Sequence, residues 1–447
     1  MFFRSIIDEL KSWKKQTKRK PLILRGARQV GKTTAVNLFS KEFKNYIYLN
    51  LEKKDDRSIF ERNLSVKDTL DYILLTKNVL LKKGETLIFI DEIQNSHKAV
   101  SLLRYFYESL PELFIIAAGS LLEMMMEENA ISFPVGRVEF RFMYPLTFEE
   151  FIIAMNNKSL LKYYNQMPVK DFAVIEIKKL FHTYTMIGGM PEIVEKYIET
   201  KNVSDLKIIY QSLITSYIDD VKKYARNGSM AEIIKHSIES APMEVGKRIK
   251  FQGFGNSNYK SREIGEALKN LQRAMLLYIV YPVTSEKPPA LVDKKKSPRL
   301  QFIDTGLLNY SLGLHSHFFK NEDLQAIYKG KLAEHIIGQE LIANDSLTSN
   351  DFLFWVKEKK QSNAEIDFLL MYNGYYIPIE VKSGRSGTLR SLHEFMDRVN
   401  HNFAVRMYNG DLSIENTKTT RGKEYKLLNL PLCFIGRIEK YIQEFMT

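Results

Sequence analysis

The spacing of hydrophobic positions changes several times along the chain, and each change predicts a different kind of element. Short, continuous apolar runs at 21–24, 86–90 and 113–120 end in turn residues or acids, which is the pattern of buried strands. Between Leu146 and Asn227 the apolar residues recur three and four positions apart, which predicts helices. A new order of helix, three strands, helix and strand begins near His317. We therefore expect an α/β protein with a helical middle part.

The same changes of pattern divide the chain into four predicted domains. A length of 447 residues is too great for a single hydrophobic core. We predict an α/β core over residues 1–147, a helical domain over 148–227, a helix–helix–hairpin module over 228–316 and a second α/β domain over 317–447. Candidate chemistry lies in the first and the last of these domains.

The first predicted strand leads into the loop "GARQVGKTT". Its spacing matches G-x-x-x-x-G-K-[ST], in which loop N–H groups and the start of the next helix cradle phosphates. Lys32 would reach the β- and γ-phosphates, and the Thr33 hydroxyl would bind Mg²⁺. A strand before the loop and a helix after it are the context that the motif requires, and a chance match is the alternative. The predicted nucleotide-binding residues are Gly26, Ala27, Arg28, Gln29, Val30, Gly31, Lys32, Thr33 and Thr34.

The second apolar strand, "TLIFI", is followed at once by two acids, Asp91 and Glu92. A Mg²⁺ ion beside a P-loop needs such an acid, so Asp91 is a predicted ligand of the ion, acting through water and together with Thr33. Glu92 is the predicted catalytic residue, placed to orient or activate the attacking water. A pair of strand-end acids that caps the next helix is the alternative.

Two further residues are candidates for contact with the γ-phosphate. Ser120 ends the third apolar strand, and it would either sense the γ-phosphate or begin a helix as its N-cap. Arg137, in "PVGRVEF", would either stabilise the transferring phosphoryl group or lie on the surface in a turn. Arg137 would act on the nucleotide bound by its own chain or on that of a neighbouring subunit. The second case implies a homo-oligomer.

These motifs resemble those of AAA-type and STAND-like P-loop ATPases. The order "GARQVGKT", "DEIQ", "GS" and "PLTFEEF" is similar to that of bacterial and archaeal proteins in which such a core precedes a C-terminal domain of unknown function. The resemblance implies ATP hydrolysis with ATP and Mg²⁺ as cofactors, and it identifies residues 148–227 as a helical lid. In "GGMPEIV" it implies that Pro191 contacts the nucleotide. A helix stop followed by a proline-started helix is the alternative.

Most of the net charge of +12 lies in one segment. Residues 221–300 hold 16 Lys and Arg against 7 Asp and Glu, a balance of +9. Such a local field attracts polyanions, nucleic acid first, and a solvated basic face without a partner is the alternative. The module over 228–316 resembles a winged helix-turn-helix with Lys294, Lys295 and Lys296 on the wing. It would contact the backbone of duplex DNA, or else serve as a protein-contact module.

The last domain has charged side chains where buried strands ordinarily have valine or isoleucine. Two strands, "AEIDFLL" and "YIPIEVKSG", are joined by an Asn-Gly turn and carry Glu365, Asp367, Glu380 and Lys382. Because side chains alternate along a strand, the charged residues of each strand share one of its faces. Carboxylates with a lysine beside them suit metal-assisted hydrolysis of a phosphodiester.

The element order and these residues resemble the restriction-endonuclease-like PD-(D/E)xK fold, although the leading Pro-Asp is missing. The resemblance implies that Asp367 and Glu380 bind Mg²⁺ or Mn²⁺ and that Glu334 is an additional acid on the preceding helix. Lys382 would be the catalytic lysine, which stabilises charge or assists the nucleophile. The same residues would also serve an inert relative as a buried ion network with a partner, so cleavage of nucleic acid stays open at this point.

Composition indicates a compartment and argues against a membrane span. No apolar run approaches the length of a span. The amino-terminal "MFFRSIIDELKSWKKQ" has the pattern of an amphipathic helix and not of a signal peptide. A lone cysteine, Cys433, fits a reducing compartment. We therefore expect a cytoplasmic protein with no membrane partner.

Two functions fit these features. The first is an ATPase that couples its nucleotide state to a DNA-binding winged helix and a nuclease-like domain, in nucleic-acid processing or defence. The second is a nucleotide-dependent switch whose C-terminal domains bind partners without cleavage.

Overall fold

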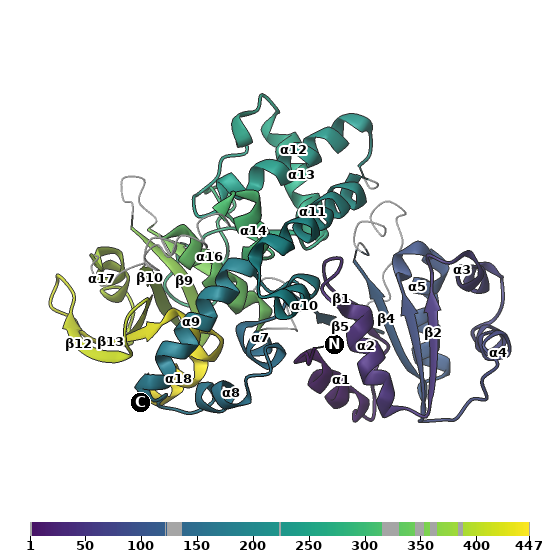
Figure 1. Ribbon diagram of the computed structural model, residues 1–447. Helices are drawn as coiled ribbons and strands as arrows, with labels where there is room; N and C mark the ends of the chain where they lie inside the picture. The colour runs from purple at the N-terminus through teal and green to yellow at the C-terminus, as the bar shows by residue number, and fades with distance from the viewer. Residues whose placement is uncertain are drawn as a thin grey trace. The chain divides into compact units, whose positions relative to one another are not determined.

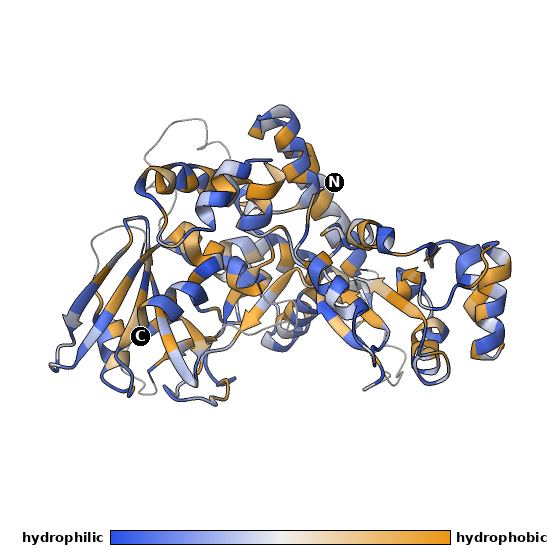
Figure 2. Ribbon diagram, turned by 90° about the horizontal axis from the view of Figure 1, so that it is seen from below, coloured by the Kyte–Doolittle hydropathy of each residue, from blue (hydrophilic) through white to orange (hydrophobic). Residues whose placement is uncertain are grey.

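The computed structural model describes residues 2–120, 122, 136–222, 225–314, 330–344, 353–357, 364–382 and 388–446. The chain forms two compact units, of which the first consists mainly of residues before Pro145 and the second mainly of the remainder (Figure 1). Along the helices, hydrophobic positions alternate with hydrophilic ones (Figure 2), as in amphipathic helices. Among the residues described here, no helix has the length and the apolar character that crossing a membrane requires.

The first unit is built on a parallel sheet of five strands in the order β2-β3-β4-β1-β5. Strands β3 and β4 are buried at every position, which explains their continuous apolar sequences. The amino-terminal amphipathic helix is present as α1, which buries Leu10 and Trp13. The strands are β1 (Leu22–Arg25), β2 (Asn45–Asn50), β3 (Thr86–Asp91), β4 (Phe114–Gly119) and β5 (Glu139–Phe142). The helices are α1 (Ile6–Lys14), α2 (Lys32–Phe39), α3 (Lys54–Glu61), α4 (Val66–Thr76) and α5 (His97–Ser109).

The second unit begins with the helical region that the sequence predicts. Its helices are α7 (Phe148–Ala154), α8 (Lys158–Tyr164), α9 (Asp171–Ile187), α10 (Pro191–Thr200) and α11 (Lys207–Lys222). The helix–helix–hairpin order then appears as α12 (Gly228–Glu244), α13 (Ser261–Arg273), β6 (Leu277–Val280) and β7 (Arg299–Phe302), followed by α14 (Thr305–Ser311). Strands β6 and β7 are antiparallel.

A mixed sheet of six strands, in the order β12-β13-β11-β10-β9-β8, completes the second unit. The predicted order of helix, three strands, helix and strand is observed from α16 to β11. The Asn373-Gly374 turn has φ values of 47° and 79°, as a tight hairpin requires. The elements are α16 (Lys331–Ala343), β8 (Leu353–Val356), β9 (Glu365–Tyr372), β10 (Tyr375–Lys382), α17 (Arg390–Met396), β11 (Phe403–Tyr408), β12 (Ser413–Lys418), β13 (Glu424–Pro431) and α18 (Ile438–Met446).

The loop between β6 and β7, which the sequence predicts to be a wing, packs onto this sheet. Val283 exchanges two backbone hydrogen bonds with β8, at 2.9 Å to Phe354 and 3.0 Å from Val356. Its side chain is buried in the same core as Trp355. Apolar contact with a strand edge thus holds part of the loop. The predicted boundary between residues 316 and 317 lies outside the described residues, but the hairpin before it and the sheet after it belong to one compact unit.

Buried polar side chains join α16 to the helices before it. Gln339 accepts hydrogen bonds from the N–H and the hydroxyl of Thr305, both at 2.7 Å. Glu340 accepts one from the Tyr184 hydroxyl at 2.6 Å and one from the Phe148 N–H at 3.0 Å. Because unsatisfied polar groups are costly in a core, these bonds specify how α16 packs on α7, α9 and α14.

Candidate functional site

The parallel sheet brings the glycine loop, Asp91 and Ser120 together at the carboxyl ends of its strands. Strand β1 leads into the glycine loop, β3 ends at Asp91, and β4, which lies between them in the sheet, is followed by the buried Ser120. The carboxyl ends of parallel strands share an edge, and open α/β sheets bind their ligands there. The helix that Ser120 would begin lies outside the described residues.

The loop between β1 and α2 has a backbone suited to binding an anion. Gln29 and Gly31 have φ values of 64° and 96°, and such left-handed residues curve a loop into an anion-binding concavity. Gly26 is required for a steric reason, because a Cβ there would lie 2.4 Å from the carbonyl oxygen of Met143. The N-cap residue of α2, Gly31, has no side chain to accept the first N–H groups of the helix, which suits the binding of an anion there. Ala27 and Val30 are buried in this loop, whereas Gln29 and Thr34 are exposed.

Lys32 is buried at the start of α2. Its Nζ donates to the carbonyl oxygens of Gly26 at 2.9 Å and Ala27 at 2.8 Å. Burial lowers the pKa of Lys32 to about 8, against the charges of Glu92 and Asp91, which raise it. A buried ammonium group whose hydrogen bonds in the described structure go to carbonyl oxygens fits the binding of a phosphate, whose charge would compensate the loss of hydration.

Asp91 and Thr33 are in direct contact, as a shared Mg²⁺ site requires. The Thr33 hydroxyl donates to Asp91 Oδ2 at 2.8 Å, and the Tyr48 hydroxyl donates to the same oxygen at 3.1 Å. The other oxygen accepts the N–H of Glu92 at 3.1 Å. These two residues would hold the ion, which supplies positive charge to the β- and γ-phosphates when bound. The role of Tyr48 is not visible in the sequence, because it depends on the pairing of β2 with β3.

Glu92 has the strained backbone that often marks a functional residue. Its φ of 52° is left-handed, a conformation that costs a non-glycine residue on the order of 1–3 kcal/mol. Burial raises the pKa of Glu92. Gln94 opposes this shift, because its Nε2 donates to Glu92 Oε2 at 2.5 Å. Gln94 is a second contact that the prediction lacks, although its position in "DEIQ" offered a signal.

Arg137 lies at the other end of the strands, near their amino termini. It precedes β5, whose first residue, Glu139, pairs in register with Leu22 at the start of β1. There Arg137 forms an exposed ion pair with Glu108 at 2.8 Å. The fold therefore does not bring Arg137 to the P-loop of its own chain, and a role toward a neighbouring subunit stays a prediction.

Pro191 is the first residue of α10, in the second unit, and the glycines before it have a packing role. The Gly189 N–H donates to Asp304 at 2.6 Å, and the Gly189 carbonyl accepts the Leu146 N–H at 2.7 Å. A Cβ at Gly189 would lie 2.2 Å from the Leu146 carbonyl oxygen. These contacts explain the Gly-x-Pro sequence without a ligand, and contact of Pro191 with a nucleotide stays a prediction.

The second unit brings the charged residues of the last domain together. Glu334 comes from α16, Asp367 from β9, and Glu380 with Lys382 from β10. Lys382 Nζ lies 2.5 Å from Glu380 Oε1, and Asp367 Oδ2 accepts the N–H of Val381 at 2.8 Å. We call Glu334, Glu365, Asp367 and Glu380 the acid cluster.

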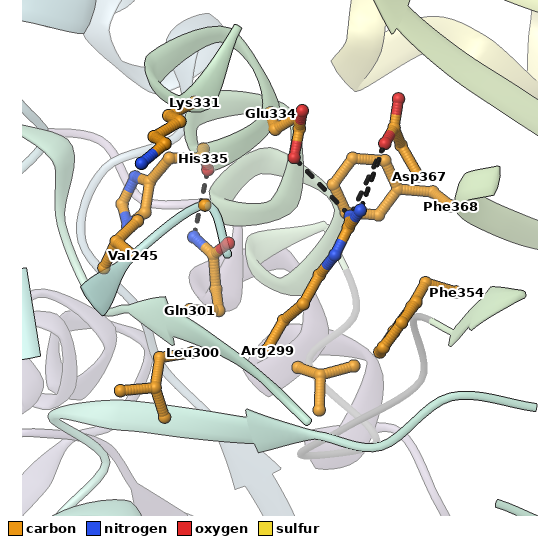
Figure 3. Close-up of a pocket in the computed structure, with 12 residues that line it drawn as sticks. Val245, Arg299, Leu300, Gln301, Lys331, Glu334, His335, Phe354, Asp367 and Phe368 are labelled. Atoms are coloured by element: carbon orange, nitrogen blue, oxygen red, sulfur yellow. Dashed lines mark hydrogen bonds and ion pairs between the residues drawn. The ribbon is translucent and has the colours of Figure 1, made fainter. Parts of the chain in front are cut away.

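Arg299, from β7, enters the acid cluster. Its guanidinium lies 3.5 Å from Glu334 and 3.4 Å from Asp367 (Figure 3). It forms a further ion pair with Glu365. It also lies over the ring of Phe354, 4.8 Å from the centroid. The sequence shows Arg299 as a charged residue at the start of an apolar strand, but its partners lie in a different predicted domain, so the prediction lacks it.

The acid cluster contains more carboxyl groups than cations. Among the described residues, its four carboxyl groups lie near Arg299 and Lys382, and Arg248 lies within electrostatic reach of Glu365. Burial, and then the charge of Asp367, raise the pKa of Glu334 to about 8. The same two causes raise the pKa of Glu380 to about 7, although Lys382 opposes them. Additional positive charge would therefore stabilise the cluster.

The donor chemistry of the acid cluster fits a hard divalent cation, but its present arrangement does not form a metal site. Within the described ranges, no three His, Cys, Asp or Glu side chains are grouped closely enough to hold an ion. Glu380 Oε2 is buried and has no hydrogen-bond partner among these residues. A cavity of about 30 Å³ lined by Glu334 and Asp367 has room for water or a small ion. Asp367, Glu380 and Glu334 would hold a Mg²⁺ or Mn²⁺ ion, which acts as a Lewis acid on phosphate oxygens when bound.

Family models match three consecutive parts of the chain. Residues 18–152 match an AAA domain. The chain carries an AAA-type P-loop ATPase domain. Residues 178–317 match a domain of unknown function (DUF8612), and residues 329–428 match a second domain of unknown function (DUF4143). The AAA domain implies binding of ATP with Mg²⁺ in general. Arg299 lies in the first domain of unknown function, and the acid cluster lies in the second.

Two solved structures resemble the chain at low sequence identity. The Walker-type ATPase PABY2304 of Pyrococcus abyssi is 14% identical, with 70% of this chain and 96% of that chain covered and a TM-score of 0.44. The ORC2 protein of Aeropyrum pernix, in ADPNP and ADP complexes, is 12% identical, with 72% and 96% covered and a TM-score of 0.30. At these TM-scores neither likeness carries an argument about function. Comparison with curated proteins gives no match.

Proposed function

We propose that the protein is an ATPase whose nucleotide state controls a metal-dependent nuclease domain. The convergence of Glu334, Asp367, Glu380 and Lys382 from three elements carries the second half of this proposal. The fold contributed by α16 and β8–β11 follows the order of the restriction-endonuclease-like domain that the sequence resembles. ATP would be the substrate of the first unit, and a nucleic-acid phosphodiester the substrate of the second.

ATP hydrolysis would use the residues at the carboxyl edge of the parallel sheet. Lys32 would neutralise the β- and γ-phosphates, and Thr33 with Asp91 would hold the Mg²⁺ ion. Glu92, positioned by Gln94, would orient the attacking water and accept its proton. The raised pKa of Glu92 fits the role of proton acceptor.

Phosphodiester cleavage would use the acid cluster with Lys382. Asp367 and Glu380 would hold the divalent ion, and Glu334 would complete its ligands. Lys382, whose pKa is raised by Glu380 against the effect of burial, would keep its charge beside the attacked phosphate. A lysine is suited to this position because it stabilises the developing charge without competing as a metal ligand.

Contact with nucleic acid would come from the basic segment. Lys260, Arg262 and Lys269 are exposed on or next to α13, and Lys294 with Lys295 is exposed in the loop between β6 and β7. These side chains would bind phosphates without reading bases. The packing of Val283 on β8 limits how far this loop could enter a groove of DNA as a wing.

A second candidate function is a nucleotide-dependent switch without nuclease activity. The ion pairs of Arg299 with three carboxylates favour it, because they are what an inert ion network would contain. In that case the second unit would bind a partner in a manner that depends on the nucleotide state of the first.

The deciding experiment compares the wild type with Asp367→Ala. Cleavage of plasmid and single-stranded DNA and RNA is measured with Mg²⁺ or Mn²⁺, with and without ATP, alongside phosphate release. We expect Asp367→Ala to lose cleavage and to keep ATP hydrolysis, because the two sites use different residues. Absence of metal binding and of cleavage in the wild type under every nucleotide condition would instead favour the switch.

A further inference from the structure

Arg299 lies where a bound cation would be expected. Its terminal nitrogens contact carboxylates from α16 and β9, while the arginine itself comes from β7 (Figure 3). The hairpin that carries it docks on β8 through its loop. Arg299, which partly neutralises the acid cluster, thus lies in the region that matches DUF8612, whereas the cluster lies in the region that matches DUF4143.

Carboxylate oxygens that pair with a guanidinium are not available to a metal ion at the same time. Both oxygens of Asp367 are engaged, Oδ1 with Arg299 and Oδ2 with the Val381 N–H. Glu334 faces Arg299 through Oε2, and Glu380 faces Lys382 through Oε1. A divalent ion at these acids would also be repelled by the guanidinium. Metal and Arg299 therefore compete for one set of ligands.

We propose that Arg299 is an internal counter-ion that keeps the metal site of the nuclease domain closed. A divalent cation binds when the Arg299 side chain withdraws. This inference rests on the proposed nuclease function and adds its regulation. The Arg299 side chain is 18% exposed to solvent, so it has a route out of the site. A movement of β7 away from α16 and β9 would withdraw it as well, so such a change within the second unit would open the site.

The test measures Mn²⁺ binding by calorimetry, using the full chain without nucleotide. We expect Arg299→Ala to bind Mn²⁺ at least about tenfold more tightly than the wild type, because the variant lacks a charge-assisted competitor. Arg299→Gln is the second variant, since it removes the charge but retains a polar group of intermediate length. Thermal unfolding establishes that each variant is folded.

Arg248→Ala is the matched control. Arg248 lies within electrostatic reach of Glu365, and its exposed side chain donates to the Ser297 carbonyl. Its removal takes away the same charge, so we expect a gain in Mn²⁺ affinity of about threefold or less, as for exposed charges. If Arg248→Ala and Arg299→Ala gain the same Mn²⁺ affinity, the gain comes from the change in net charge alone, and the proposal is overturned. The double variant Arg299→Ala/Asp367→Ala lacks one of the proposed metal ligands. If it still binds Mn²⁺ more tightly than the wild type, the proposal is also overturned.

Cleavage assays on the same variants separate this inference from the nuclease proposal. Tighter Mn²⁺ binding in the Arg299 variants without any cleavage would support the counter-ion and reject the nuclease. Cleavage by the wild type that is unchanged or abolished in the folded Arg299 variants would support the nuclease and reject the counter-ion. Mn²⁺ affinity equal to or below that of the wild type in both variants rejects the counter-ion outright.

Discussion

Lys32 and Asp367 are charged side chains that the fold withdraws from water, with exposed fractions of 6% and 8%. An ion in such a position costs several kcal/mol unless partners compensate it. Lys32 has carbonyl dipoles and two nearby acids, and Asp367 has Arg299 and a backbone N–H. Lys32 can therefore take a phosphate as a further partner, whereas Asp367 can take a metal ion only in place of Arg299.

Lys32 and Glu92 are expected to separate ATP binding from turnover. Lys32→Ala should weaken ATP binding by about 100-fold or more, because it removes the cation that faces the β- and γ-phosphates. Glu92→Gln should keep the affinity and lose phosphate release, because charge and not shape activates water. Nucleotide titration and a phosphate-release assay measure the two effects. Normal ATP affinity in Lys32→Ala would be incompatible with the assigned P-loop.

Tyr48 is expected to position Asp91 for the ion. Tyr48→Phe removes one neutral hydrogen bond to Asp91 Oδ2, a loss of about 1 kcal/mol. The Mg²⁺ concentration needed for half-maximal ATP hydrolysis should rise by roughly fivefold at an unchanged maximal rate. Tyr46→Phe, on the same strand, is the control, since its hydroxyl donates to Asn37. A similar change in both variants would show that only the packing of the strand matters.

At the scale of elements, α16 contributes to both the candidate site and the polar core of the second unit. Glu334 faces the acid cluster, and about one and a half turns later Gln339 and Glu340 bind α14, α9 and the start of α7. Burial raises the pKa of Glu340 to about 7, against the hydrogen bonds from Tyr184 and Phe148. The helix is therefore sensitive to pH at a position away from the acid cluster.

Glu340 should make the second unit less stable as the pH rises. Its folded pKa of about 7 lies above the usual value of 4.5, so the folded state binds the proton more tightly than the unfolded state. The free energy of unfolding should then fall between pH 4.5 and 7, by an amount on the order of 3 kcal/mol. Glu340→Gln keeps an acceptor for Tyr184 and should remove this dependence. Unfolding of both proteins is followed from pH 5 to 8, and a constant difference between them would contradict the assignment.

Local patterns predicted elements well, and contacts between distant segments less well. The loop around Gly31 and the strand before Asp91 are encoded within a few residues, so motif and periodicity reveal them. The shared strand faces likewise predicted that Asp367 and Glu380 would meet. The contact between Arg299 and β9 depends on how two predicted domains pack, which no short pattern records. The docking of Val283 on β8 was hidden for the same reason.

At the scale of the whole molecule, charge is distributed unevenly. The segment 221–300 carries +9 of the net +12, while the acid cluster gathers four carboxyl groups in the second unit. A polyanion would be attracted by the first feature and repelled by the second unless cations neutralise it. Binding of nucleic acid and binding of metal are therefore expected to support each other.

The basic segment is expected to set the affinity for DNA and its dependence on salt. Replacing Lys294, Lys295 and Lys296 by Glu should weaken duplex binding. It should also reduce the slope of log affinity against log salt by roughly 0.9 for each phosphate that the variant no longer neutralises. Fluorescence anisotropy at several salt concentrations measures both. No binding by the wild type at low salt would identify the segment as a protein-contact module.

The docking of Val283 also determines how the chain can be divided. Strand β8 is the last strand on its side of the six-stranded sheet, and Val283 covers part of its outer edge. An uncovered edge of this kind is a template for pairing with other chains. A fragment of residues 317–447, cut at the boundary that the sequence predicts, would lack this cover and should self-associate. A fragment that begins at residue 145 would retain both Val283 and Arg299, and it should remain monodisperse.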